Sequence, residues 1–121
     1  MSVSYAWTTL HIEDLDKSLK FYRDVVGMKV VMQYRIEPVD EDVAVIEQAG
    51  GGKIELVARK GFKLSLSEQE NFSLAIETDD AKSVIDSLGN EMPQPIVIDE
   101  HTKFFFTNDP DGYPLNIIEK K

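Results

Sequence analysis

The 121-residue chain contains no cysteine, which excludes disulfide bonds, thiolate zinc sites and a cysteine nucleophile. No apolar run approaches the length of a membrane span. The first residues lack a basic segment followed by an apolar one, the usual mark of a secretory signal. We therefore expect a cytoplasmic protein. Only two histidines and one tryptophan are present.

Basic residues are also scarce. Thirteen Lys and Arg face 22 Asp and Glu, which gives a formal charge of −9 at pH 7. Such a charge repels phosphate backbones and anionic lipid, so we expect neither nucleic acid nor membrane as a partner. It suits cationic ligands, although an acidic surface can equally serve only to keep a protein soluble.

The pattern of apolar residues in the first half alternates between strand and helix periods. Residues 4–12 alternate as a strand, which places Trp7, Thr9 and His11 on one face. A helix is predicted next, between an N-cap at Asp14 and a C-terminal Gly27. Three further strands are predicted at 28–36, 43–47 and 53–59.

The second half repeats this order. A strand is predicted at 72–78, then a helix that begins after Asp79 or Asp80 and ends at Gly89. The remaining strands are predicted at 96–98, 103–107 and 115–119. The Phe104–Phe106 run must divide between the two faces of its strand.

The two halves read as an internal repeat. Helix residues 16–19 correspond to 81–84, an offset of 65 residues. The fold class predicted is α+β: one compact domain of two βαβββ modules at 1–60 and 71–121, joined by a connector at 61–70. A helix covers the outer face of each sheet, and the other faces form an open cup of mixed sheet.

Two motifs carry a family resemblance. LHIEDLDKSLKFYRDVVGM at 10–28 and DPDGYPL at 109–115 resemble the opening and closing signatures of the vicinal oxygen chelate superfamily. That group includes glyoxalase I, extradiol dioxygenases, fosfomycin resistance enzymes and bleomycin-binding proteins. The resemblance covers essentially the whole chain. It implies paired βαβββ modules with an open cup between them, and a homodimer.

The resemblance also implies four metal-ligand positions, which fall on Trp7, Glu55, Asn71 and Asn116. Only Glu55 is a residue type that binds divalent metals well, because amide oxygens are weak ligands and the indole offers none. We therefore expect no metal and no other cofactor. Zinc, nickel, manganese or iron belongs only to the alternative of a metal-dependent enzyme.

These positions, together with their neighbours, supply the candidate ligand-binding residues. They are Trp7, Thr9, His11, Glu55, Asn71, Ser73 and Asn116. Trp7 is either a core aromatic or an apolar wall for a planar ligand. Glu55 is either paired with a base at the rim or the one anionic anchor of the site. His11 and Glu55 are weak candidates for acid–base catalysis.

The leading hypothesis is a metal-free protein that binds a small organic molecule, cationic or aromatic, in the cup between the modules. The alternative is a metal-dependent lyase or isomerase similar to glyoxalase I. A dioxygenase would need two histidines and a carboxylate around iron. A metal-free enzyme using His11 and Glu55 is a further possibility. Whether the protein is an enzyme at all stays open at this point.

Overall fold

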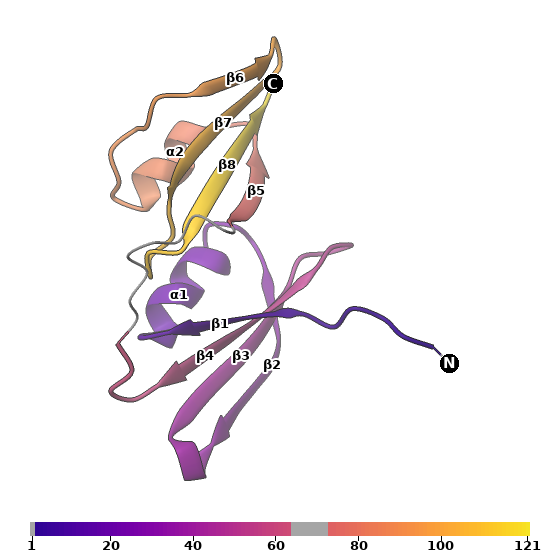
Figure 1. Ribbon diagram of the computed structural model, residues 1–121, viewed down its shortest axis with the longest axis vertical. Coiled ribbons are helices and arrows are strands. Elements are labelled where there is room, and N and C mark those ends of the chain that lie inside the picture. Colours follow the sequence, from indigo (N-terminus) through magenta and orange to yellow (C-terminus); the bar gives the residue numbers. More distant parts are fainter. Residues whose placement is uncertain (1, 64–72) are drawn as a thin grey trace. The chain divides into compact units, whose positions relative to one another are not determined.

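The computed structural model describes residues 2–63 and 73–121, and the chain divides into two compact units, 1–64 and 65–121. Each unit contains one helix and one four-stranded mixed sheet (Figure 1). The predicted fold class is thereby confirmed as two βαβββ modules. That their open faces together form a cup stays a prediction.

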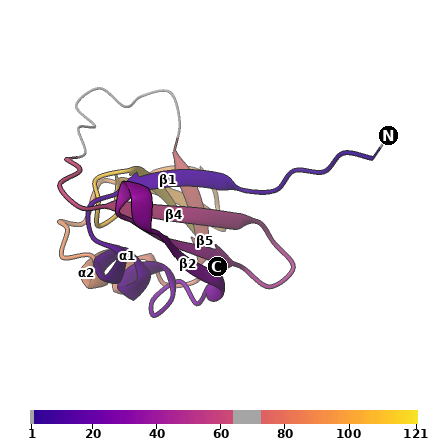
Figure 2. The same ribbon diagram turned by 90° about the horizontal axis from the view of Figure 1, so that it is seen from below.

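The first unit follows the predicted order. Its elements are β1 (Thr8–Ile12), α1 (Leu15–Tyr22), β2 (Lys29–Ile36), the 3-10 turn η1 (Glu37–Val39), β3 (Glu41–Glu47) and β4 (Lys53–Arg59). The strand order in the sheet is β1-β4-β3-β2, with β1 parallel to β4 and the other pairs antiparallel. In both ribbon views β1 and β4 lie side by side and α1 covers one face of the sheet (Figures 1 and 2).

Helix α1 is positioned by its cap and by its apolar side. The Asp14 carboxylate accepts a hydrogen bond from the Lys17 amide at 3.2 Å, as the N-cap prediction requires. Leu19 is buried on the helix, and Leu10 and Leu56 are buried in the sheet. The helix-covered face of the sheet therefore holds core residues of this module. The opposite face, which α1 does not cover, is called the open face below.

The second unit has the same topology. Its elements are β5 (Leu74–Thr78), α2 (Ala81–Ser87), β6 (Ile96–Asp99), β7 (Thr102–Asn108) and β8 (Pro114–Lys120). The strand order is β5-β8-β7-β6, with β5 parallel to β8.

The two candidate caps of α2 are now resolved. Asp80, not Asp79, is the N-cap, and its carboxylate accepts from the Ser83 amide at 3.2 Å. The Glu119 carboxylate of β8 accepts from the Ala81 amide at 2.9 Å, which satisfies a second free N–H at this end of the helix.

Phe105 is buried, as expected for the helix-covered face of β7, whereas Phe106 is 48% exposed. The predicted division of the three phenylalanines is therefore confirmed.

Pairing registers show how the two modules correspond. Thr9 pairs with Glu55 between β1 and β4, and Ala75 pairs with Asn116 between β5 and β8. If these two pairs correspond, Thr9 matches Ala75, which is 66 residues later in the chain. The helix N-caps, Asp14 and Asp80, are also 66 residues apart. The predicted helix offset of 65 is therefore wrong by one residue.

By the same offset, the residue that corresponds to Trp7 in the repeat is Ser73. Asn71 and Phe72 lie outside the described residues.

The first strand is shorter than predicted. It begins at Thr8 instead of residue 4, because its parallel partner β4 begins only at Lys53 and Thr8 already pairs with Ile54. Residues 2–7 lead away from the sheet (Figures 1 and 2). No helix in the described part of the chain is long and apolar enough to cross a membrane.

Candidate functional site

The centre of the site is Glu55, on the open face of the first sheet. Thr9 Oγ1 donates a hydrogen bond to Glu55 Oε1 at 2.8 Å, and the Tyr34 hydroxyl donates to Glu55 Oε2 at 3.1 Å. One carboxylate on β4 therefore links β1 on one side to β2 on the other. Each carboxylate oxygen can accept a further hydrogen bond.

Tyr34 reaches Glu55 across an intervening strand. β3 lies between β2 and β4, so the hydrogen bond carries the tyrosine side chain over β3. Val43 and Val45 of β3 pair with Tyr34 and Glu55 respectively, and each is only 1% exposed. The Tyr34 side chain therefore crosses the strand that carries these two buried valines.

A β-bulge places Tyr34 on this face. The β2–β3 register shifts between Val30 and Met32, so Val30 pairs with Ile46 whereas Met32 pairs with Val45. Strict alternation would put Val30 and Tyr34 on the same, helix-covered face. One extra residue reverses this and turns Tyr34 outward. Sequence reasoning missed Tyr34, because a single bulge leaves no reliable signal in the strand pattern.

The hydrogen bond to Glu55 changes the acidity of Tyr34. The pKa of Tyr34 is raised, chiefly because its hydroxyl donates to Glu55, then by burial and by the negative charges of Glu55 and Glu41. Glu41 is itself ion-paired with Arg59 at 2.8 Å. Among the described residues, Glu55 has no basic partner of this kind. The hydrogen-bond partners of its carboxylate within residues 2–63 and 73–121 are the hydroxyl groups of Thr9 and Tyr34.

The other predicted residues of the first module lie at varying distances from this centre. Thr9 contacts Glu55 directly. His11 lies on the same face as Thr9, two residues further along β1, where it pairs with Val57 of β4. Its ring centroid is 6.2 Å from that of Phe62. Trp7 is partly buried and immediately precedes β1. Its place in a binding site stays a prediction.

The predicted site residues of the second module differ in how the structure places them. Asn116 occupies the position in β8 that Glu55 occupies in β4, and it is 7% exposed. Ser73 is exposed immediately before β5. Asn71 lies outside the described residues.

A divalent metal does not fit the donors present. The positions that correspond to the family's ligands supply one carboxylate, an indole and amide or hydroxyl groups, and the carboxylate is already bonded by Thr9 and Tyr34. Within residues 2–63 and 73–121 no group of three or more His, Asp or Glu side chains could hold a metal ion.

A cavity of about 770 Å³ lies elsewhere in the first module, at the end of the sheet beside the start of α1. Tyr34 is part of its wall, but Glu55 is not. The lining residues are Glu13, Asp14, Leu15, Asp16, Gln33, Tyr34, Arg35, Asp40, Asp42, Ala58, Arg59 and Lys60.

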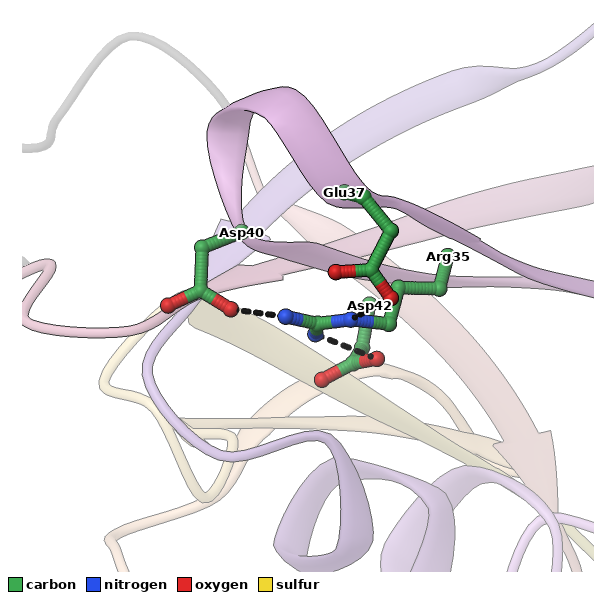
Figure 3. A network of polar contacts seen from close by, with 4 residues as sticks. All are labelled: Arg35, Glu37, Asp40 and Asp42. Atoms are coloured by element: carbon green, nitrogen blue, oxygen red, sulfur yellow. Dashed lines mark hydrogen bonds and ion pairs between the residues drawn. The ribbon is translucent and has the colours of Figure 1, made fainter.

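Much of this wall is occupied by an internal ion-pair network (Figure 3). Arg35 bonds Glu37 at 3.0 Å and Asp42 at 3.1 Å, and also pairs with Asp40. These three carboxylates raise the pKa of the guanidinium further above its usual value. The network fixes the η1 turn, in which Asp40 adopts a left-handed conformation at φ 53°. Arg35 is therefore engaged in structure and is a poor anchor for a ligand.

The fold and the Glu55 site together define a class of protein. Its members have paired βαβββ modules and polar side chains on the sheet face that the helix does not cover. The family comparison then places the chain. Residues 4–117 match the model of the Glyoxalase/Bleomycin resistance protein/Dioxygenase superfamily, and the protein belongs to that superfamily. The resemblance in the sequence motifs is thereby confirmed.

Individual relatives agree with this placement. The chain is 30% identical to a protein of Vibrio parahaemolyticus named probable lactoylglutathione lyase, over 94% of this chain and 88% of that one. A glyoxalase family protein from Enterococcus faecalis has the same fold, with a TM-score of 0.75 and 20% identity over 96% and 97% of the two chains. Leishmania major glyoxalase I gives a TM-score of 0.71 and 23% identity over 98% and 87%.

Proposed function

We propose that the protein binds a small organic cation on the open face of the first sheet, with Glu55 as its anionic anchor and without a transition metal. The observation that carries this proposal is the state of Glu55. Its carboxylate is oriented by Thr9 and Tyr34, and no basic side chain among the described residues neutralises it. A cation would supply the missing positive charge.

The surroundings support an apolar or aromatic body on that ligand. Tyr34 and Met32 are exposed on the same face, at 38% and 50%. The face of an aromatic ring attracts a cation that lies over it. The net charge of −9 adds a long-range attraction for a cation. A homodimer and a cytoplasmic location, both expected from the sequence, belong to this proposal as well.

A second candidate is lactoylglutathione lyase activity. It is favoured by the name of the Vibrio parahaemolyticus relative, which is 30% identical over nearly the whole chain. The donor inventory opposes a metal-dependent form of that activity, because Glu55 is the one carboxylate among the matched ligand positions. His11, on the same face as Glu55, is the side chain that a metal-free acid–base reaction would use.

The test uses a matched pair of probes. Benzyltrimethylammonium carries a positive charge beside a ring, and neopentylbenzene has the same shape without the charge. The single tryptophan, Trp7, reports binding by fluorescence, and ¹⁵N NMR shifts of β1 and β4 locate it. We expect the cation to bind more tightly than its neutral isostere.

Glu55→Gln separates the two candidates. This variant keeps the shape of the side chain and removes its charge, so the preference for the cation should disappear. Equal binding of both probes to the unmodified protein would contradict the proposal. Lactoylglutathione lyase activity that needs added metal and is lost in Glu55→Gln would favour the second candidate.

A further inference from the structure

The second module contains a buried polar atom without a partner. Asn116 lies in the middle of β8 and is 7% exposed, and its Oδ1 atom is buried with no hydrogen-bond partner among the described residues. Nearly all buried polar groups in folded proteins are hydrogen-bonded, and one left unmatched costs free energy. The unpaired Asn116 oxygen, at the position equivalent to Glu55, is therefore unusual and needs a physical explanation.

Comparison of the modules shows why this oxygen is unmatched. In the first module, Thr9 and Tyr34 donate to Glu55. The pairing register makes Ala75 the counterpart of Thr9. Tyr34 pairs with Val43, and Ile96 pairs with Phe104 in the equivalent place, so Ile96 is the counterpart of Tyr34. Both hydroxyl donors are thus replaced by apolar residues in the second module.

The surroundings of Asn116 are apolar and aromatic. Phe106 pairs with Asn116 and is 48% exposed, and Phe104 follows on the same open face. Their ring centroids lie 6.2 Å apart in an edge-to-face arrangement. Ala75, which is exposed, pairs with Asn116 on the other side and has a small side chain. The result is a buried acceptor between aromatic side chains and an exposed alanine.

We propose that the Asn116 carbonyl oxygen accepts a hydrogen bond from a neutral N–H or O–H group attached to an aromatic or apolar body. The bound molecule supplies a hydrogen-bond donor in place of the hydroxyl groups that Thr9 and Tyr34 supply in the first module. Because the Asn116 oxygen is buried, the molecule must displace a neighbouring aromatic side chain to reach it. We expect this side chain to be Phe106, which is partly exposed. The inference rests on the proposed function, because it concerns the binding of the same kind of small organic ligand.

The probes for this subsite are phenol, which has an O–H donor, and anisole, which has the same ring without a donor. Binding is measured by NMR, from the side-chain amide signals of ¹⁵N-labelled Asn116 and from the Phe106 ring signals. We expect phenol to bind roughly two- to tenfold more tightly than anisole, as one net hydrogen bond implies. Equal affinities, or shifts that bypass Asn116, would overturn the proposal.

Ala75→Thr provides an internal competitor, because it restores the hydroxyl found at Thr9. Ala75→Val is its matched control, with the same shape and no hydroxyl. In Ala75→Thr, phenol binding should weaken until phenol binds no more tightly than anisole. In Ala75→Val, phenol should still bind more tightly than anisole. The same loss in both variants would show that shape alone matters and would contradict the role of Asn116.

Asn116→Leu tests the orphan acceptor through stability. An unmatched buried oxygen contributes nothing favourable, so its apolar replacement should leave the urea midpoint unchanged or raise it, while removing the preference for phenol. A clear fall in the midpoint would show that Asn116 is bonded within the protein. Glu55→Gln should leave phenol binding unaltered, so failure at Asn116 and failure at Glu55 are distinguishable.

Discussion

The Tyr34 hydroxyl lies 3.1 Å from Glu55 Oε2 although a complete strand, β3, separates the two residues in the sheet. The contact does two things at once. It orients the carboxylate that we propose as the ligand anchor, and it carries the Tyr34 side chain across the strand that holds Val43 and Val45. The proposed anchor and the packing of this face therefore both involve Tyr34.

The first prediction concerns alkaline pH. The pKa of Tyr34 is raised, mainly by its hydrogen bond to Glu55. The stability that comes from this group is therefore complete below the usual tyrosine pKa of about 10 and is lost as pH rises through the raised pKa. Tyr34→Phe should flatten the alkaline decline in the urea midpoint. An unchanged slope in this variant would contradict the hydrogen bond.

Glu55→Gln tests the cause of the same shift. It removes the negative charge, so the pKa of Tyr34 should return toward its ordinary value. ¹³C NMR of the tyrosine ring carbons measures this directly. A Tyr34 pKa that stays raised in Glu55→Gln would mean that burial, not Glu55, dominates.

The sequence predicts the modules well, for physical reasons that are visible in particular residues. Asp14 is followed by an apolar stripe at helical spacing, and its carboxylate does cap the helix. The limits of β1 could not be predicted in the same way, because they depend on where β4 begins. A strand ends where its partner ends, and the partner is 40 or more residues away in the chain.

The second prediction concerns the core of each module. Leu19 and Ile85 are 3% and 0% exposed on α1 and α2. Truncation of either to alanine should cost about 2–5 kcal/mol of unfolding free energy, because it leaves a cavity at the helix–sheet contact. Urea denaturation measures the loss. Val97→Ala, at a site that is 64% exposed, is the control and should have little effect. An unchanged urea midpoint in both Leu19→Ala and Ile85→Ala would show that the helix faces are wrongly assigned.

The third prediction concerns acid. The pKa of Asp80 is lowered, first by the Ser83 hydroxyl, which donates to it at 2.7 Å, and then by the Ser83 amide. A lowered pKa means that this contribution to stability is present above the usual aspartate pKa and is lost as pH falls through the lowered one. Asp80→Asn should keep the cap oxygen yet weaken the dependence of stability on pH in the acid range. An acid limb identical to that of the unmodified protein would contradict this.

The fourth prediction concerns the network at η1. Arg35→Gln leaves Glu37, Asp40 and Asp42 without their shared cation, so their mutual repulsion should lower the melting temperature. Added salt should reduce the difference, since it screens exposed charges. Arg23→Gln, which breaks a single exposed pair with Asp24, is the control and should change little. A similar loss in both variants would show that the network adds nothing to a single pair.

The candidate site could be predicted only in part. Glu55 follows from its position relative to the family motifs, and Thr9 from strand alternation next to it. Tyr34 could not be found, since the bulge between Val30 and Met32 reverses the face on which it lies. The unpaired Oδ1 of Asn116 could not be predicted either. It results from the lack of side-chain donors at Ala75 and Ile96, and only the strand register shows that these two residues are the counterparts of Thr9 and Tyr34.

The most direct test of the central claim, that Glu55 anchors an organic cation and not a transition metal, is the metal content of the protein. It is purified without chelator, dialysed against zinc, nickel, manganese or iron(II), freed of unbound ion and analysed by mass spectrometry, beside Glu55→Gln treated identically. We predict substoichiometric metal in both proteins, because one carboxylate already bonded to Thr9 and Tyr34 gives too few donors to replace the hydration shell of the ion. An equimolar metal that is lost in Glu55→Gln would contradict the account.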